Sequence, residues 1–264
     1  MSRLNGQAVA ITGGLGDIRR ATAARLLAEG ARVALLDLGN QRDHPWLAAN
    51  RCDELTFLEA DVSERAQLDA ALASVNARFG RLDVLIGNAG MVVNQPFLAV
   101  EAGAWESTLR VNLSGAFHSA QAAARIMITQ PRRNGIRGKI LFTSSWVQEM
   151  PWPEGAAYAT SKAGMRMLAK VMAQELAEDG ITVNVLAPGI VMAGLSARIH
   201  ERDPAFRARV QAAIPMGAMQ TAESVAGAFL FLCSADSDYM TGATLLIDGG
   251  ASLVRRQAAA DSLE

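Results

Sequence analysis

The sequence is short of the residues that build thiolate metal sites, disulfide frameworks and basic surfaces. Its 264 residues include two cysteines, three lysines and three histidines. Cys52 and Cys233 lie far apart and form no CxxC pair, so we expect neither a thiolate metal site nor a disulfide framework. The histidines are scattered without ligand spacing, and none is assigned to a metal. Since no disulfide is expected, we take a reducing compartment as the default location and expect a cytoplasmic protein.

The chain also lacks an excess of charge and a long apolar segment. Lysine plus arginine number 25 against 26 acidic residues, and the net charge of −1 offers no general attraction to nucleic acid or to an anionic membrane. No cationic start followed by an apolar run resembles a signal peptide, and no segment reaches the ~18 apolar residues that span a bilayer. We therefore expect neither nucleic acid nor membrane as a partner. Half of the residues are hydrophobic, which is enough for one sizeable core.

Short apolar runs alternate with segments of helical periodicity along the whole chain. The runs predict strands at residues 8–12, 32–36, 55–60, 82–86, 139–143, 182–187 and 244–247. Helices are predicted at 18–29, from a cap at Ser63 through Phe79, at 102–128, around Tyr158, and from a cap at Thr221 through Cys233. This alternation implies an α/β fold, a doubly wound parallel sheet.

Two segments fall outside the repeating pattern. Residues 192–215 lack strand character and are predicted to form a mobile helical lid. The last residues are polar and rich in alanine, so the domain is taken as residues 1–254 and the tail as residues 255–264. The terminal Leu-Glu is a candidate expression tag.

The first predicted strand ends in the glycine turn Gly13-Gly14-Leu15-Gly16, which leads into a helix. A helix N-terminus presents unpaired N–H groups and the positive end of the helix dipole, which suits a phosphate. The second strand ends in Asp37, and a carboxylate there accepts hydrogen bonds from the ribose hydroxyls of NAD and repels a 2′-phosphate. The pattern predicts a dinucleotide site, with an ordinary strand-to-helix turn as the alternative.

A serine, a tyrosine and a lysine in residues 144–163 carry the predicted chemistry. Tyr158 and Lys162 are separated by one helical turn, so both project from one face of a helix. A phenol has a reference pKa of ~10, and a nearby ammonium, aided by a cofactor's positive ring, is expected to lower that pKa. Tyr158 could then exchange a proton with a substrate hydroxyl, while Ser145 holds the substrate oxygen.

These residues and their order resemble the short-chain dehydrogenase/reductase family, and the likeness extends from Gly6 to about Gly250. The resemblance implies a single Rossmann domain with a seven-stranded parallel sheet in the order 3-2-1-4-5-6-7. It also implies NAD-dependent interconversion of a secondary alcohol and a ketone. It adds Asn112 to Ser145, Tyr158 and Lys162 as a catalytic tetrad, in which Asn112 would anchor a water that links Lys162 to solvent.

The same resemblance implies a set of cofactor contacts, which lie in the glycine turn, at strand ends and in the tetrad. They are Gly13, Gly16, Asp17, Ile18, Asp37, Asp61, Val62, Asn88, Ala89, Gly90, Tyr158, Lys162, Pro188, Gly189 and Val191.

Four positions depart from the family pattern. The glycine turn usually reads TGxxxGxG, but Asp17 and Arg19 stand where its second and third glycines belong. A carboxylate at Asp17 would face the pyrophosphate; alternatively, Gly16 takes the tight position and Arg19 turns towards the phosphates. Gly87 replaces the first asparagine of Asn-Asn-Ala-Gly, and Ala193 replaces a threonine. These changes leave open a second function, that of a weakly catalytic or non-catalytic Rossmann ligand-binding module.

Substrate and assembly are less defined by the sequence. An apolar cleft beside Tyr158 is expected from Trp146, Met150, Trp152, Met192, Leu195 and Ile199, whereas Arg198 and Arg202 could meet an acidic group. Sugar, acyl-thioester, steroid and small-ketone substrates all remain open. The family resemblance implies a homotetramer built on the 102–128 helix and the Tyr158 helix. Their many small or apolar residues agree with this, and the alternative is a monomer.

Overall fold

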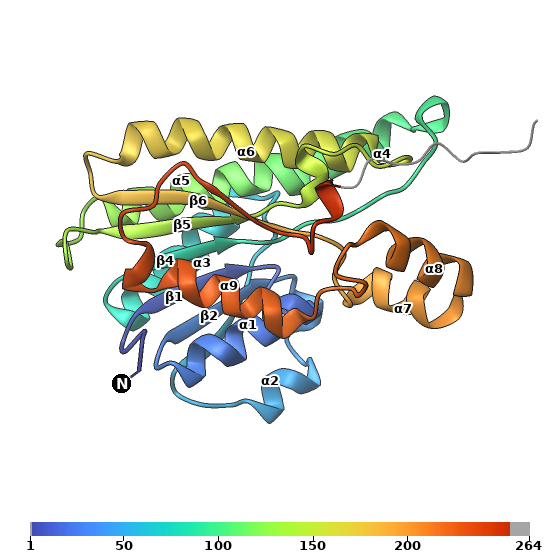
Figure 1. Ribbon diagram of the computed structural model, residues 1–264. Helices are drawn as coiled ribbons and strands as arrows, with labels where there is room; N and C mark the ends of the chain where they lie inside the picture. Colours follow the sequence, from blue (N-terminus) through green and yellow to red (C-terminus); the bar gives the residue numbers. More distant parts are fainter. Residues whose placement is uncertain (1, 254–264) are drawn as a thin grey trace, which may run out of the picture.

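The predicted apolar runs pair side by side in one parallel sheet (Figure 1). The computed structural model describes residues 2–253, apart from the side chain of Leu195, so the predicted tail at 255–264 lies outside it. Within these residues the sheet has seven strands in the order β3-β2-β1-β4-β5-β6-β7, as the family resemblance implied. The strands are β1 (Ala8–Thr12), β2 (Arg32–Asp37), β3 (Leu55–Glu59), β4 (Val84–Gly87), β5 (Gly138–Thr143), β6 (Ile181–Pro188) and β7 (Thr244–Ile247).

The strand order creates a crevice at one edge of the sheet. β1 pairs with β2 on one side and with β4 on the other, so the connections leave β1 and β4 in opposite directions. In open α/β sheets, ligands bind at this switch point, outside the carboxyl ends of the strands.

Helices follow the strands and cover both faces of the sheet. The α-helices are α1 (Asp17–Ala28), α2 (Pro45–Ala49), α3 (Arg65–Phe79), α4 (Ala102–Leu109), α5 (Gly115–Met127), α6 (Ala156–Leu176), α7 (Gly194–Arg202), α8 (Pro204–Ala213) and α9 (Ala222–Cys233). Short single-turn helices are η1 (Gly39–Gln41), η2 (Phe97–Ala99), η4 (Trp146–Gln148), η5 (Ala235–Ser237) and η6 (Ala251–Leu253), and η3 (Arg110–Ser114) is a π-turn.

Two apolar cores hold the layers together. On one face, α3, α5 and α6 bury Leu72, Ala123 and Met165 against the sheet. On the other face, α1 and α9 bury Leu26 and Phe229. Figure 1 shows α5 and α6 on one side of the strands and α1 and α9 on the other. Because both faces are covered, β1, β5 and β6 are buried along their whole length, which explains their mainly apolar sequences.

The predicted lid is a pair of helices beyond the carboxyl end of the sheet. α7 and α8 follow β6 and project from the body of the molecule (Figure 1). Asp203 begins α8, because its carboxylate accepts hydrogen bonds from the backbone N–H groups of Ala205 and Phe206. The helical prediction is therefore confirmed, and the mobility of the pair stays a prediction.

Two local expectations differ from the structure. Ser63 does not cap α3, which begins after Glu64; instead both the N–H and the hydroxyl of Ser63 donate to the Asp61 carboxylate, at 2.8 Å each. The helix predicted at 102–128 is present but contains the π-turn η3, which separates α4 from α5 around Asn112. The Thr221 cap is confirmed, since its side chain accepts from the N–H of Ser224.

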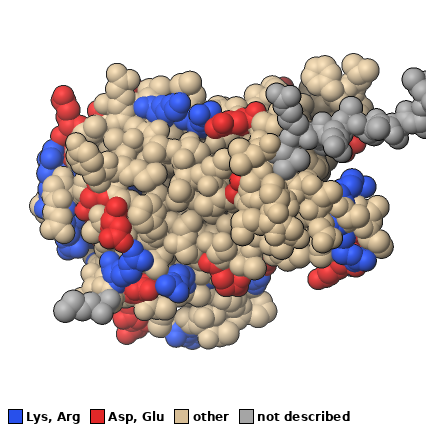
Figure 2. All heavy atoms as spheres, in the orientation of Figure 1, with Lys and Arg blue, Asp and Glu red and all other residues tan. Residues whose placement is uncertain are grey.

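The surface carries charges of both signs. On the face in Figure 2, acidic and basic side chains are interspersed, mostly near the margins, around a broad uncharged area. This face therefore presents no large field of one sign, in line with the net charge of −1.

Candidate active site

A cavity of about 460 Å³ opens beside the glycine turn, at the switch point of the sheet. It is lined by Gly13, Leu15, Gly16, Arg19, Asp37, Leu38, Gln41, Ala60, Asp61, Val62, Ala89, Gly90, Met91 and Val111. Seven of the predicted cofactor contacts, from Gly13 to Gly90, are thus brought together: Gly13, Gly16, Asp37, Asp61, Val62, Ala89 and Gly90.

The glycine turn brings two strand ends into close contact. Gly13 has φ +64°, and a Cβ there would lie 2.8 Å from the Cα of Ala89, so only glycine fits. The Thr12 hydroxyl accepts hydrogen bonds from the N–H groups of Asn88 and Ala89, at 3.0 and 3.2 Å. The ends of β1 and β4 are therefore fixed against each other at the edge of the cavity.

Asp37 lies at the end of β2 and joins that strand to the turn. One carboxylate oxygen accepts from the N–H of Leu15 at 3.0 Å, and the other accepts from the N–H of Leu38 at 2.8 Å. Each carboxylate oxygen can accept a further hydrogen bond, and the group faces the cavity. Asp37 can therefore accept from a hydroxyl-bearing ligand.

The two charged residues of the turn point in different directions. The Asp17 carboxylate pairs with Arg20 and accepts a hydrogen bond of 2.7 Å from the N–H of Gly194, the first residue of α7. The hydrogen bond from Gly194 and the charge of Arg20 lower the pKa of Asp17 against the opposing effect of burial. Asp17 does not line the cavity, whereas Arg19 does, and Ile18 lines a second cavity described below.

The catalytic candidates meet at the carboxyl end of β5. Lys162 lies on α6 and is 3% exposed; its ammonium donates to the Thr143 carbonyl at 2.7 Å and lies 5.6 Å from the centre of the Tyr158 ring. Ser145, the second residue after β5, has a side-chain hydrogen bond with Tyr158. The structure thus brings Ser145, Tyr158 and Lys162 into one cluster.

Asn112 reaches the same cluster from the π-turn. Its side chain is fully buried, accepts from the N–H of Met91 at 2.8 Å, and donates to the Met91 carbonyl at 2.9 Å. It also donates to the Ser161 hydroxyl at 3.1 Å. A Cβ on Gly90 would lie 3.3 Å from Asn112 and 3.8 Å from the Lys162 ammonium, so these groups are close neighbours. Asn112 fixes the loop after β4 against α6.

Burial dominates the electrostatics of the cluster in the protein alone. Burial raises the pKa of Tyr158, and a hydrogen bond with Ser145 and the charge of Arg19 act in the opposite direction. Burial, with a contribution from Arg19, lowers the pKa of Lys162 to about 7. In the protein alone the pKa of Tyr158 is therefore raised, and its lowering by Lys162 together with the positive ring of a bound cofactor stays a prediction. A buried lysine is itself poorly hydrated and only partly charged at neutral pH.

A second cavity, of about 350 Å³, lies between Tyr158 and the lid. Its lining is Ile18, Val92, Asn94, Ser145, Trp146, Val147, Trp152, Gly155, Tyr158, Ala159, Gly189, Ile190, Val191, Ala193, Ser196, Ile199 and Phe206. None of these is Asp, Glu, Lys or Arg.

The lining decides between the sequence-based expectations for this cleft. Trp146 and Trp152 meet edge to face with ring centres 5.7 Å apart. These two and Ile199 line the cavity as expected, whereas Met150, Met192, Arg198 and Arg202 do not. Val92 and Asn94 in the loop after β4 and Phe206 in α8 were missed, because the sequence gives no signal for how loops and lid close over a cleft.

Three further cofactor candidates follow the end of β6. Gly189 and Val191 line the second cavity, whereas Pro188 ends β6 without lining either one. A Cβ on Gly189 would lie 2.7 Å from the Cα of Asp248, so β6 and the segment after β7 meet closely there. Asn88, the remaining candidate, is 5% exposed and lies behind Ala89 and Gly90.

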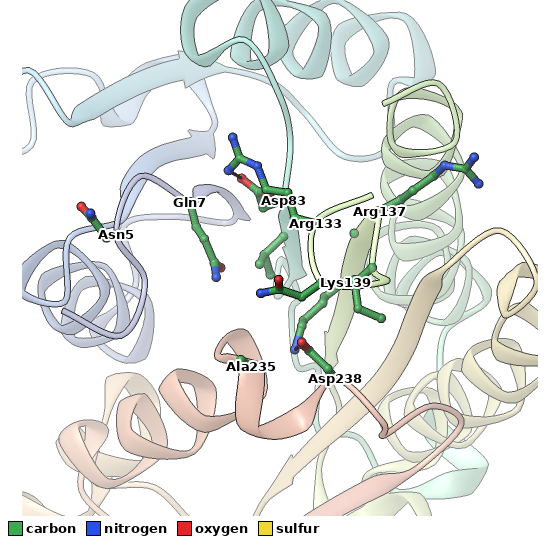
Figure 3. A pocket seen from close by; sticks show the side chains of 12 residues that line it. Asn5, Gln7, Asp83, Arg133, Arg137, Lys139, Ala235 and Asp238 are labelled. Atoms are coloured by element: carbon green, nitrogen blue, oxygen red, sulfur yellow. Dashed lines mark ion pairs between the residues drawn. The ribbon is translucent and has the colours of Figure 1, made fainter. Parts of the chain in front are cut away.

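A third hollow, at the amino ends of the strands, carries a different set of side chains (Figure 3). The Lys139 ammonium is buried there and is fully paired, with the Ser234 carbonyl at 2.6 Å, the Ser237 hydroxyl at 2.9 Å and Asp238 at 2.7 Å. Asp83 pairs with Arg81 at 2.5 Å and accepts from the N–H of Ala8 at 2.8 Å. These contacts join strand ends to η5 and have a structural role.

The first two cavities fit a nicotinamide dinucleotide. Nε of Arg19 and Nδ2 of Asn88 are buried without a hydrogen-bond partner among the described residues; Arg19 lines the cavity by the glycine turn, and Asn88 precedes Ala89 and Gly90, which line it. Phosphate and ribose oxygens are acceptors for such donors. The adjoining cavity contains Tyr158 and Ser145. The fold and site define a dinucleotide-dependent oxidoreductase.

Known proteins resemble the chain over nearly its whole length. The family model described as enoyl-(acyl carrier protein) reductase matches residues 13–252. The 3beta-hydroxysteroid dehydrogenase 1 of Eggerthella lenta is 35% identical over 253 residues, which cover 95% of each chain. The 3-oxoacyl-(acyl-carrier-protein) reductase FabG of Escherichia coli is 32% identical over 252 residues, which cover 94% of this chain and 98% of FabG.

Solved structures agree. A gluconate 5-dehydrogenase from Burkholderia cenocepacia, in complex with NADP and tartrate, has a TM-score of 0.88 and 35% identity. The similarity covers 96% of this chain and 98% of that one. The chain belongs to the short-chain dehydrogenase/reductase family and is an oxidoreductase that interconverts a secondary alcohol and a ketone with a nicotinamide cofactor.

Two other kinds of site are absent from residues 2–253. In that range no group of three His, Cys, Asp or Glu side chains is placed to hold a metal ion. None of the helices described has the length and apolar character needed to cross a membrane.

Proposed function

We propose that the chain uses Tyr158 as the proton donor and acceptor, Ser145 to orient the substrate oxygen, and NAD(H) as the cofactor. The observation that carries the proposal is the convergence of Ser145, Tyr158 and Lys162 in one cluster beside the second cavity, which Ser145 and Tyr158 line. The bound nicotinamide would accept or supply the hydride.

The remaining steps belong to the protein's own groups. Ser145 hydrogen-bonds the phenol and holds the substrate oxygen beside it. Lys162, with a pKa near 7, can gain or lose a proton at neutral pH and so can restore the proton that Tyr158 exchanges. We further propose that Asn112 keeps Lys162 accessible to a water, since its contacts with Met91 and Ser161 fix the adjoining loop.

The preference for NAD over NADP rests on two carboxylates, Asp37 at the end of β2 and Glu59 at the end of the neighbouring β3. Asp37 lines the cavity, and Glu59 packs against Gly39, where an added Cβ would collide with it. The nearby cation, Arg42, is exposed and lies 4.0 Å from Glu59. A 2′-phosphate would meet two carboxylates here, which is the physical argument against the NADP bound by the gluconate 5-dehydrogenase structure.

We propose a neutral, mainly apolar secondary alcohol as the substrate. The second cavity is lined by tryptophan, phenylalanine and branched aliphatic side chains, and its polar groups are uncharged. An ionised substrate would lose hydration there without gaining a partner of opposite charge. Among the relatives, this chemistry is nearer to the hydroxysteroid of the Eggerthella lenta enzyme than to gluconate.

We also propose a homotetramer. Phe117 on α5, Ile128 directly after α5, and Met167 and Val171 on α6 are 40 to 60% exposed. Ala120, Ala122 and Ala123, which are among the small residues of α5 from which the sequence predicted this interface, are buried inside the subunit. The larger side chains support a symmetric contact with a second copy.

The cytoplasmic location stays a proposal. It rests on cysteine usage, because Cys52 is exposed and free and Cys233 is buried and free.

Substitution of the tyrosine tests the proposed chemistry. Tyr158→Phe should abolish turnover while NADH still binds, because only the proton-exchanging hydroxyl is lost. NADH affinity is measured by fluorescence titration and turnover with a panel of neutral alicyclic alcohols. A kcat within about tenfold of the parent, or ~1.4 kcal/mol of barrier, would show that Tyr158 is not the proton donor.

A further inference from the structure

Arg19 is the residue of the glycine turn that differs most from its family counterpart, and its side chain lies inside the cofactor cavity. It is the third residue of α1 and curls back over the start of the helix, where a Cβ on Gly16 would collide with its Nη1. Its Nη2 donates to the Asn88 carbonyl at 2.9 Å. The guanidinium thus spans the crevice from the turn after β1 to the end of β4.

The guanidinium is incompletely paired in this position. Nε is buried and has no hydrogen-bond partner among the described residues. Burial lowers the pKa of Arg19, while the charges of Asp37, Tyr158 and Asp17 act in the opposite direction. No ion pair is formed with Arg19 among the described residues. A buried cation with a free donor favours an anionic ligand.

Asp17, the second unusual residue, forms its ion pair with Arg20 and none with Arg19. Asp17 is neutralised by Arg20 and tied to the first residue of the lid through the N–H of Gly194. The carboxylate therefore faces away from the cavity, and the guanidinium faces into it. The positive end of the α1 dipole adds to the same field.

We propose that Arg19 binds the pyrophosphate of the cofactor through its side chain, in place of the close backbone approach that glycine at positions 17 and 19 allows in the family. The proposal rests on the proposed function, because it requires a dinucleotide in this cavity. A guanidinium offers a planar pair of donors to phosphate oxygens, and Arg19 has Nε free for one of them. Recognition of the phosphates then depends on one side chain.

The test uses ADP, which carries the pyrophosphate without the nicotinamide, and isothermal titration calorimetry on the full chain. Arg19→Ala should raise the Kd for ADP by about tenfold or more, since a charge-assisted hydrogen bond is lost. Arg19→Gln keeps a donor for the Asn88 carbonyl but not the charge, and should lose a similar factor. The control is Arg25→Ala, which removes an exposed cation from the same helix and should leave the Kd unchanged.

The outcomes separate this proposal from the one on which it depends. Unchanged or tighter ADP binding in both Arg19 variants would overturn the proposed role of Arg19, since its side chain would then contribute nothing to phosphate binding or would hinder it. That result would leave the proposed enzymatic function unaffected. A parent protein that binds neither ADP nor NADH would overturn the cofactor proposal as well. Melting temperatures of the ligand-free variants check that each has folded.

Discussion

Lys162 makes the stability of the ligand-free protein depend on pH, because burial lowers its pKa from the ordinary 10.5 to about 7. Between these two values the unfolded chain binds more protons than the folded one, so the free energy of unfolding rises with pH. A difference of one bound proton between the two states changes the free energy of unfolding by ~1.36 kcal/mol per pH unit, and Lys162 in the folded protein is only half deprotonated at pH 7. The contribution of Lys162 should therefore increase by about 2 kcal/mol from pH 7 to pH 9.

The assay is urea unfolding at pH 7, 8 and 9 and constant ionic strength, with Lys162→Met as the matched variant. Methionine has a similar length and no titrating group. The free energy of unfolding of the Lys162→Met variant should therefore rise by about 2 kcal/mol less than that of the parent over the same pH range. Cys233, whose pKa burial raises to about 12, lowers the stability of both proteins only above about pH 9 and cancels in the comparison. Equal pH dependence in the two proteins would mean that Lys162 titrates near its ordinary pKa and that the relay proposed for it is wrong.

Three further changes test other parts of the molecule. Asp37→Ala should lower the ratio of kcat/KM for NAD to that for NADP by about tenfold, as expected for loss of a charge-assisted hydrogen bond, and an unchanged ratio in steady-state assays would contradict the assignment. Lys139→Met should lower the free energy of unfolding by about 3 kcal/mol, because Asp238 loses its buried partner; urea unfolding measures this, and Lys170→Met on the outer face of α6 is the control. Met167→Asp should shift the mass seen by light scattering towards the 28.0 kDa of one chain, and a parent already at that mass would exclude the tetramer.

Much of the fold could be predicted from the sequence because the strands lie in a covered parallel sheet. Strands buried on both faces read as mainly apolar runs, and the runs at β1, β5 and β6 were placed within a residue of each end. β4 was placed too early, since Leu82 and Asp83 lie before it and Asp83 belongs to the polar contacts at the amino end. Strand ends are set by such contacts, which a local pattern does not contain.

The arrangement of the site could be predicted where it depends on the spacing of two residues along one helix. It could not be predicted where segments distant in the sequence meet. The four-residue interval of Tyr158 and Lys162 places both on one helical face. The π-turn at Asn112 depends on packing between α4, α5 and α6. Ser63 does not cap α3, because its own N–H and hydroxyl donate to the Asp61 carboxylate, and the helix begins after Glu64. The direction of the Tyr158 pKa shift required the extent of burial, and the path of Arg19 required the position of Asn88.

The contacts around Lys139 and Asp83 have a consequence for how this chain tolerates change. They anchor the starts of β1, β4 and β5 through charges and hydrogen bonds that are withdrawn from water. Both substituted glycine positions, Asp17 and Arg19, are at the opposite end of the strands. The residues that anchor the strands are therefore different from those that bind the cofactor and react. Residues at the carboxyl ends of the strands can be substituted, by evolution or by design, while the contacts at the amino ends keep the strands in register.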